Sequence, residues 1–286
     1  MPIKLIAMDL DGTLLDSRGK LPDENVKAVA EAAENGVKIV IVTGRRFNSA
    51  RLSTQALRCD VDFITSNGAL IKSRSGETCY RKLLPAGVAR QVLEFTAEYR
   101  ACAGVIFDRP LERQVIFEQI DWNGAYVGPY LARHREQVAE VRPLTDCLDG
   151  EDPVEILFLS DCAAIARVAR LLSQSSLASH YTLAITEYQA RNLSMLDVLQ
   201  RGVSKGAALA EWASRQGFAR DEILAIGDNW NDREMLQYAG FPVVMGNSVA
   251  ALKESGWETT LSNDDCGVAH VIRKYVLAAP AIDGKR

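Results

Sequence analysis

The sequence of 286 residues contains no apolar run near the length of about 20 residues that a membrane-spanning helix needs. It also lacks a strong charge imbalance, because 33 lysines and arginines stand against 37 aspartates and glutamates. This balance gives no electrostatic reason to expect nucleic acid or an anionic membrane as a partner. The chain enters a strand pattern at once, without the features of a targeting segment. We therefore expect a cytoplasmic protein whose partner is a small molecule.

Paired cysteines are missing as well. None of the six cysteines stands in a Cys-x-x-Cys arrangement, so neither a zinc ribbon nor a thioredoxin-like motif is indicated. We interpret them as reduced and mostly buried thiols. A hydrophobic content of 48% and a charged content of 24% are typical of an ordinary globular protein, and the length suggests roughly two domains.

What the chain does contain is an alternation of apolar strands and helical patterns. In the first third, Ile3–Met8 and Val37–Gly44 read as buried strands on either side of a helical pattern at Asp23–Asn35. Such repeats indicate a parallel sheet covered by helices. Between about Pro85 and Met195 the strands look antiparallel instead, and the alternation then resumes. The sequence therefore predicts an α/β core interrupted by an inserted mixed domain.

Polar residues follow three of the predicted strands. In open α/β sheets the ligand site lies outside the carboxyl ends of the strands, so these residues are expected at one edge. The helix that begins near Ser204 adds Lys205 from its first turn. The residues at the strand ends are Asp9 and Asp11 after the first strand, Thr43 and Gly44 after the second, and Asp228, Asn231 and Asp232 after a late one.

Two carboxylates one residue apart, directly behind an apolar run, repel each other and are costly to bury without compensation. Asp9, the backbone carbonyl of Asp11 and the carboxylate of Asp228 are hard oxygen ligands suited to Mg²⁺, which would neutralise them. Gly12 permits the tight turn that brings backbone amides close to an anion.

A phosphate group suits the remaining residues of this edge. The Thr43 hydroxyl and the Gly44 amide can hold phosphate oxygens, and Lys205 adds a positive charge. No histidine, serine or cysteine is placed to act as a nucleophile. A carboxylate therefore remains for that task, as in aspartyl-phosphate enzymes.

The stretches "DLDGT", "TGR", the lysine of "GVSKG" and "GDNWND", in this order, resemble the four motifs of the haloacid dehalogenase superfamily. The similarity extends to "VMGNS" and "DDCGVA". With its large insertion after the third strand, the chain most resembles the Cof-type branch, whose members are magnesium-dependent phosphatases with a type 2 cap. The resemblance implies a Rossmann-like parallel core with helices on both faces, formed by residues 1–84 and 197–286. Residues 85–196 would then be an inserted α+β cap domain that sets substrate specificity.

The resemblance also implies a role for each matching position. Asp9 would be the nucleophile, and Asp11 the general acid that protonates the leaving oxygen and then the base that activates water. Asp9, the Asp11 carbonyl and Asp228 would hold Mg²⁺, and Asp232 would orient Lys205 or a metal-bound water. Trp230 stands where smaller or polar residues are common and could narrow the entrance. The phosphoryl group would be bound by the Leu10 amide, Thr43, Gly44, Lys205 and Asn231.

The leading hypothesis is hydrolysis of a small phosphate monoester such as a sugar phosphate. A phosphomutase shares this core, but its typical small cap follows the first motif, where the segment Asp16–Val37 is too short for one. A non-catalytic sensor of a phosphorylated metabolite is the third hypothesis. The intact set of Asp9, Asp11, Lys205 and Asp228 argues against such a sensor.

Overall fold

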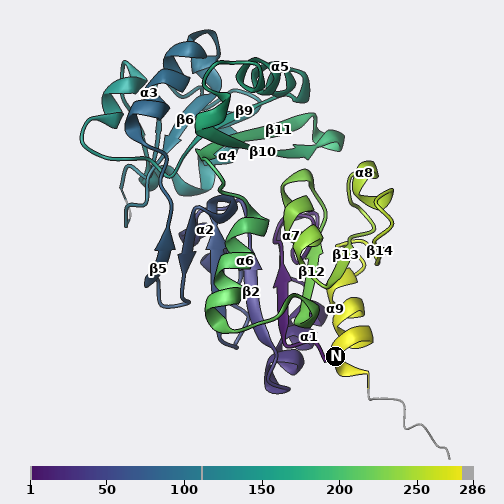
Figure 1. Cartoon of the computed structure of the whole chain (residues 1–286). Helices are drawn as coiled ribbons and strands as arrows, with labels where there is room; N and C mark the ends of the chain where they lie inside the picture. Colours follow the sequence, from purple (N-terminus) through teal and green to yellow (C-terminus); the bar gives the residue numbers. More distant parts are fainter. Residues whose placement is uncertain (1, 111, 279–286) are drawn as a thin grey trace, which may run out of the picture. The chain divides into compact units, whose positions relative to one another are not determined.

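The computed structural model describes residues 2–110 and 112–278, and the chain divides into two compact units (Figure 1). The first unit is built from the segments that end at Cys79 and begin at Lys205, and the second is Tyr80–Ser204. All six cysteines carry free thiols. Within the described ranges, no helix has both the length and the apolar character needed to cross a bilayer.

The first unit contains an eight-stranded sheet with the order β14-β13-β12-β1-β2-β3-β4-β5. The strand β1 lies between β12 and β2 and pairs in parallel with both, and β3 continues the parallel arrangement. The strand β4 then pairs antiparallel with β3, which the sequence patterns did not indicate. The strands are β1 Leu5–Met8, β2 Lys38–Val42, β3 Val61–Thr65, β4 Leu70–Lys72, β5 Thr78–Arg81, β12 Ile223–Gly227, β13 Phe241–Val244 and β14 Glu258–Thr259.

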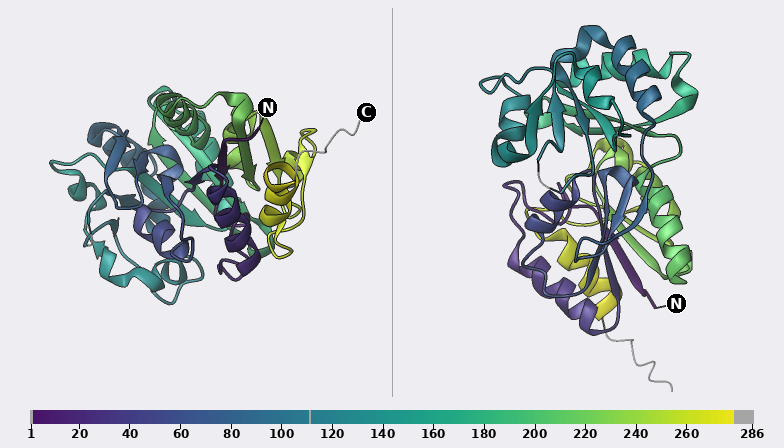
Figure 2. Two further views of the ribbon diagram at one scale, coloured as in Figure 1. Left: turned by 90° about the horizontal axis from the view of Figure 1, so that it is seen from below. Right: turned by 90° about the vertical axis from the view of Figure 1, so that its left-hand side faces the viewer.

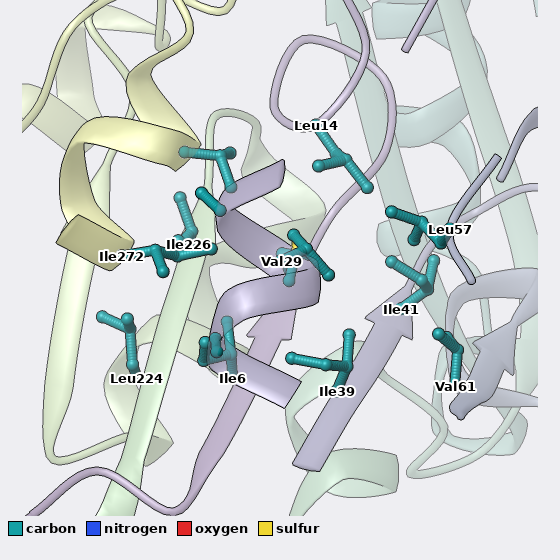
Figure 3. Close-up of a cluster of buried hydrophobic side chains, with 14 of the residues drawn as sticks. Ile6, Leu14, Val29, Ile39, Ile41, Leu57, Val61, Leu224, Ile226 and Ile272 are labelled. Atoms are coloured by element: carbon teal, nitrogen blue, oxygen red, sulfur yellow. The ribbon is translucent and has the colours of Figure 1, made fainter. Parts of the chain in front are cut away.

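Helices cover both faces of this sheet. Side chains of α1 and α9, such as Val29 and Ile272, pack on the strands beside Ile6, Ile39 and Leu224 (Figure 3). The helices α6 and α7 lie on the opposite side of the strands (Figure 2, right). The central strands β1, β2, β3 and β12 are buried on both faces, which explains why they are mostly apolar. The edge strand β5 is polar and mostly exposed. The helices are α1 Asp23–Glu34, α2 Phe47–Ser53, α6 Lys205–Gln216, α7 Arg233–Tyr238, α8 Ala250–Lys253 and α9 Gly267–Ile272, which a π-helical turn at Arg273–Leu277 follows.

The second unit contains a six-stranded sheet with the order β10-β11-β9-β6-β7-β8. Its pairs are antiparallel except for β7 with β8. Side chains of α3 and α5 form a hydrophobic cluster with one face of this sheet. The strands are β6 Ala103–Ile106, β7 Val115–Phe117, β8 Val138–Glu140, β9 Glu155–Ser160, β10 Tyr181–Tyr188 and β11 Leu193–Gln200, and the helices are α3 Ala86–Phe95, α4 Val127–Leu131 and α5 Cys162–Ser173.

The predicted class is confirmed: a Rossmann-like parallel core with helices on both faces is combined with a mixed α/β unit whose sequence interrupts it. The parallel strands β1, β2, β3 and β12 end at the same edge of the core sheet. This edge is where open α/β sheets bind ligands.

Candidate active site

The loop after β1 turns sharply at Gly12, which has a φ of +81°. A Cβ atom built on Gly12 would lie 2.3 Å from Oδ2 of Asp228, so the loop approaches Asp228 more closely than a side chain allows. The next residue, Thr13, donates its hydroxyl to Oδ1 of Asp228 at 2.8 Å. The first motif is thus joined directly to the loop that follows β12.

Lys205 is the first residue of α6 and is 1% exposed. Its Nζ donates to Oδ1 of Asp9 at 2.7 Å and to Oδ1 of Asp232 at 2.6 Å. The other oxygen of Asp232 accepts from the backbone amides of Asp228 at 2.9 Å and Asn229 at 3.0 Å. Both oxygens of Asp232 therefore have partners within the protein.

Three carboxylates gather at this point, because one oxygen each of Asp9, Asp228 and Asp232 lies within 4.8 Å of the others. Burial raises the pKa of Asp9 to about 7, and the negative charges of Asp232 and Asp11 add to the rise while Lys205 opposes it. The pKa of Asp228 is also raised well above its usual value, first by burial and then by Asp232 and Asp9. Burial acts to lower the pKa of Lys205, but Asp232 and Asp9 together hold it above its ordinary value. One lysine thus faces three buried carboxylates.

The loop after β2 carries Thr43 and Gly44. Thr43 is 1% exposed, and its hydroxyl oxygen accepts from the amide of Arg45 at 3.1 Å. Gly44 faces the side chain of Asn67, since a Cβ atom on Gly44 would lie 3.2 Å from Oδ1 of Asn67. The backbone amide of Asn67 donates to the backbone carbonyl of Thr43 at 3.1 Å. The loop therefore rests on the segment that follows β3.

Asn67 is fully buried and has a φ of +52°, a left-handed conformation that is uncommon outside glycine. Its Oδ1 accepts from Nδ2 of Asn231 at 2.8 Å. The Oδ1 of Asn231 is buried and has no hydrogen-bond partner among the described residues. Asn67 thus links the loop after β2 with the one after β12. The sequence argument gave Asn67 no role. It lies at the carboxyl end of the stretch "VDFITSNG", which reads as a third short strand, so the same rule about strand ends would have found it.

The structure connects the predicted residues in two sets. Hydrogen bonds join Asp9, Lys205, Asp232 and, through a backbone amide, Asp228. Thr43, Gly44 and Asn231 meet through Asn67.

Three further residues lie apart from these sets. The Asp11 side chain pairs with Arg45, a residue of the "TGR" motif to which the sequence argument gave no role. The Leu10 side chain is part of the hydrophobic core of the first unit. Trp230 is 38% exposed.

Comparisons with known proteins show which family the chain resembles. The sequence profile of the haloacid dehalogenase-like hydrolases matches residues 6–272. A phosphatase of Bacillus subtilis, 5-amino-6-(5-phospho-D-ribitylamino)uracil phosphatase YcsE, is 30% identical over 278 residues, covering 96% of each chain. The stress response protein YhaX of the same organism is 28% identical over 96% of this chain and 94% of its own. A solved structure of a phosphatase of this superfamily from Bacteroides thetaiotaomicron superposes with a TM-score of 0.77 at 25% identity, over 96% of this chain and 95% of that one.

The chain belongs to the haloacid dehalogenase-like hydrolases, since the profile spans nearly the whole sequence. The resemblance to the Cof-type branch is confirmed. The predicted enzyme class, a phosphatase, is confirmed by this membership together with the named relatives.

Proposed function

We propose that the protein hydrolyses a small phosphate monoester, such as a sugar phosphate, with Mg²⁺ and through an aspartyl-phosphate on Asp9. The observation that carries this proposal is the buried contact of Lys205 with Asp9 and Asp232, directly beside Asp228. A nucleophilic carboxylate, a fixed cation and a second carboxylate thereby stand together at the ligand-binding edge of the sheet.

The residues present fit a divalent cation. Asp9 and Asp228 are buried carboxylates with raised pKa values, so their charges are poorly compensated in the protein alone. Both oxygens of Asp232 are already engaged. Asp9, Asp228 and the Asp11 carbonyl therefore remain as the oxygen ligands, a set that suits Mg²⁺. When bound there, Mg²⁺ supplies positive charge that offsets these carboxylates and the phosphoryl oxygens.

In the first half of the reaction, a carboxylate oxygen of Asp9 attacks phosphorus. The bond from phosphorus to the leaving-group oxygen breaks, and the carboxylic acid of Asp11 gives its proton to that oxygen. In the second half, the Asp11 carboxylate takes a proton from a water whose oxygen attacks phosphorus. The bond between phosphorus and Asp9 then breaks, which releases phosphate and restores the nucleophile.

Charge develops on the equatorial phosphoryl oxygens during both halves. Lys205 is held in place by Asp232, so its ammonium group is preorganised beside the reacting oxygen of Asp9. Thr43, Gly44, Asn231 and the amide of Leu10 complete the phosphate site. Asn67 accepts from Asn231 through its side chain and donates to the Thr43 carbonyl, next to Gly44, through its backbone amide, so these donors keep a fixed spacing.

Selectivity for the leaving group is assigned in this proposal to residues 85–196, as a cap domain on a core of residues 1–84 and 197–286. The name of the Bacillus subtilis relative describes a phosphorylated ribityl compound, which supports a small, polyhydroxylated leaving group. A cytoplasmic location, where such metabolites occur, is part of the same proposal.

A panel of phosphorylated metabolites tests this function. Purified protein with Mg²⁺ should release inorganic phosphate from several sugar phosphates and from p-nitrophenyl phosphate, and chelation with EDTA should abolish release from all of them. Full activity in EDTA would contradict the metal assignment. Phosphate transfer between hydroxyl groups of a sugar phosphate, without release, would instead indicate a phosphomutase.

A further inference from the structure

Arg45 follows Thr43 and Gly44 in the loop after β2, and its guanidinium group binds Asp11 through two hydrogen bonds. Nε donates to Oδ2 at 2.6 Å and Nη2 donates to Oδ1 at 2.5 Å. The two side chains are 25% and 31% exposed. A paired arrangement of this kind is the strongest and most directional contact between arginine and a carboxylate, and it sets the plane of the carboxylate as well as its position.

The guanidinium group is itself held in place. Its Nη1 donates to the hydroxyl of Ser53 at 2.5 Å, at the end of α2. The backbone of Arg45 is fixed on both sides, since its amide donates to Oγ1 of Thr43 and its carbonyl accepts from the amide of Ser66 at 3.0 Å. The direction of the Asp11 carboxyl group is therefore tied to the same loop that carries Thr43 and Gly44.

All three guanidinium nitrogens of Arg45 have partners within the protein. Arg45 is thus engaged with Asp11 and Ser53 and is not extended toward a phosphoryl group. A neutral Asp11 carboxylic acid still has one carbonyl oxygen that can accept from Arg45, so the contact can persist in part when Asp11 carries a proton.

We propose that Arg45 is a positioning residue that aims the Asp11 carboxyl group at the leaving-group oxygen. This inference rests on the proposed function, in which the Asp11 proton passes to that oxygen as its bond to phosphorus breaks. Arg45 acts through Asp11 alone, so in the first half of the reaction its effect on the rate grows with how much the leaving group needs a proton.

The test compares two leaving groups. p-Nitrophenolate departs readily without a proton, whereas the alkoxide of glucose 6-phosphate, or of a faster alkyl phosphate found in the panel, requires one. Arg45→Gln should lower kcat/KM on the alkyl phosphate by roughly 10- to 100-fold, because this ratio reports the half of the reaction that releases the leaving group. Such a loss is a part of the roughly 100- to 10,000-fold that a general acid contributes. On p-nitrophenyl phosphate, kcat/KM should fall less than about 3-fold. The readout is kcat/KM because kcat also contains the second half, in which Asp11 activates water for either substrate.

Two further variants sharpen the comparison. Arg45→Lys keeps the charge but cannot form the paired contact, and it should show the same selectivity with a smaller loss. Arg51→Gln is the matched control, because Arg51 is an exposed arginine of α2 that lies over the ring of Phe47. This control should leave the rates on both substrates unchanged.

A double variant, Arg45→Gln with Asp11→Asn, tests whether Arg45 acts through Asp11. If Arg45 acts through Asp11, Arg45→Gln should cause no further loss on the alkyl phosphate once Asp11 is replaced. Equal losses of kcat/KM on both substrates would overturn the inference and make Arg45 a phosphate ligand. Additive losses in the double variant would overturn it too. If kcat/KM of Asp11→Asn itself shows no dependence on the leaving group, it is the proposed function that fails.

Discussion

Lys205 and Asp9 are 196 residues apart in the chain, yet Nζ of the lysine lies 2.7 Å from Oδ1 of the aspartate in a site that is almost fully buried. Burying an ion pair is favourable only when further hydrogen bonds satisfy it. Asp232 supplies one to Lys205 and is itself held by two backbone amides. The cation is therefore rigid and placed where negative charge arises during phosphoryl transfer.

Asp228→Asn should weaken Mg²⁺ binding by roughly 10- to 100-fold, because a hard cation loses one of few charged protein ligands. Titration calorimetry with Mg²⁺ measures the affinity directly. Asp221→Asn is the matched control, since this exposed residue lies just before β12 while Asp228 lies just after it. Equal affinities for Asp228→Asn and the unchanged protein would contradict a metal site at Asp228.

Replacement of the two aspartates of the first motif should separate their roles. Asp9→Asn should form no covalent phosphoenzyme, because the amide cannot attack phosphorus. Asp11→Asn should form it from p-nitrophenyl phosphate but hydrolyse it about 100-fold more slowly or worse, since the attacking water loses its base. Acid-quenched protein after reaction with radiolabelled substrate reports both results. Label on the Asp9→Asn protein would show that the nucleophile lies elsewhere.

Gly12→Ala should lower the free energy of unfolding by more than the backbone strain of a left-handed alanine alone. A left-handed alanine costs about 1–2 kcal/mol of folding free energy in general. Gly19 has a similar φ of +73° but no neighbour within 4 Å of an added Cβ, so Gly19→Ala should cost only this amount. At Gly12 the added Cβ meets the Asp228 carboxylate, so Gly12→Ala should cost more and also abolish activity. Urea unfolding of the two variants compares them, and equal losses would contradict the close approach.

Without metal, the contribution of Asp9 to the free energy of unfolding should fall as the pH rises from about 4 to about 7. The pKa of Asp9 is raised from 3.8 to about 7, so the folded protein binds this proton more tightly than the unfolded chain. Deprotonation through this interval therefore lowers the free energy of unfolding, by an amount on the order of a few kcal/mol, and the loss is complete above pH 7.

Other carboxylates have lowered pKa values and act in the opposite sense. The measurement is therefore the difference in unfolding free energy between the unchanged protein and Asp9→Asn, in EDTA, across this pH range. This difference should decrease with rising pH, and Mg²⁺ should reverse the trend because its ligands bind in their ionised form. A difference that stays constant would contradict the raised pKa of Asp9.

Asn67→Gly and Asn67→Ala should have different effects on stability but similar effects on activity. Glycine adopts a positive φ without strain, whereas alanine there costs about 1 kcal/mol or more. Both variants remove the side-chain amide of Asn67, whose oxygen accepts from Asn231 and which lies next to Gly44. Inorganic phosphate should therefore inhibit both more weakly than it inhibits the unchanged protein. Unaltered inhibition of Asn67→Gly would show that the amide does not support the phosphate site.

The residues of the site could be located from the sequence because they stand at strand ends. Apolar runs of strand length, separated by helical patterns, require a parallel sheet, and parallel strands bring their carboxyl ends to one edge. The sequence alone therefore predicts that Asp9, Thr43 and Asp228 lie at the same edge of the sheet. The same argument places Lys205 in the first turn of a helix at this edge and Asp232 after the late strand. The family motifs add the roles of these residues.

Only the tertiary structure decided which side chains meet. The side chain of Lys205 is flexible, so the sequence does not show which carboxylates it contacts. Its hydrogen bonds to Asp9 and Asp232 depend on how the surrounding core packs. The pairing of Arg45 with Asp11 joins loops from two different strands. Asn67 has a left-handed backbone, which asparagine adopts more readily than most residues, and its side chain binds Asn231 of a distant loop. Periodicity determines which face or edge a residue occupies, whereas rotamers and contacts between distant segments are set only when the whole core packs together.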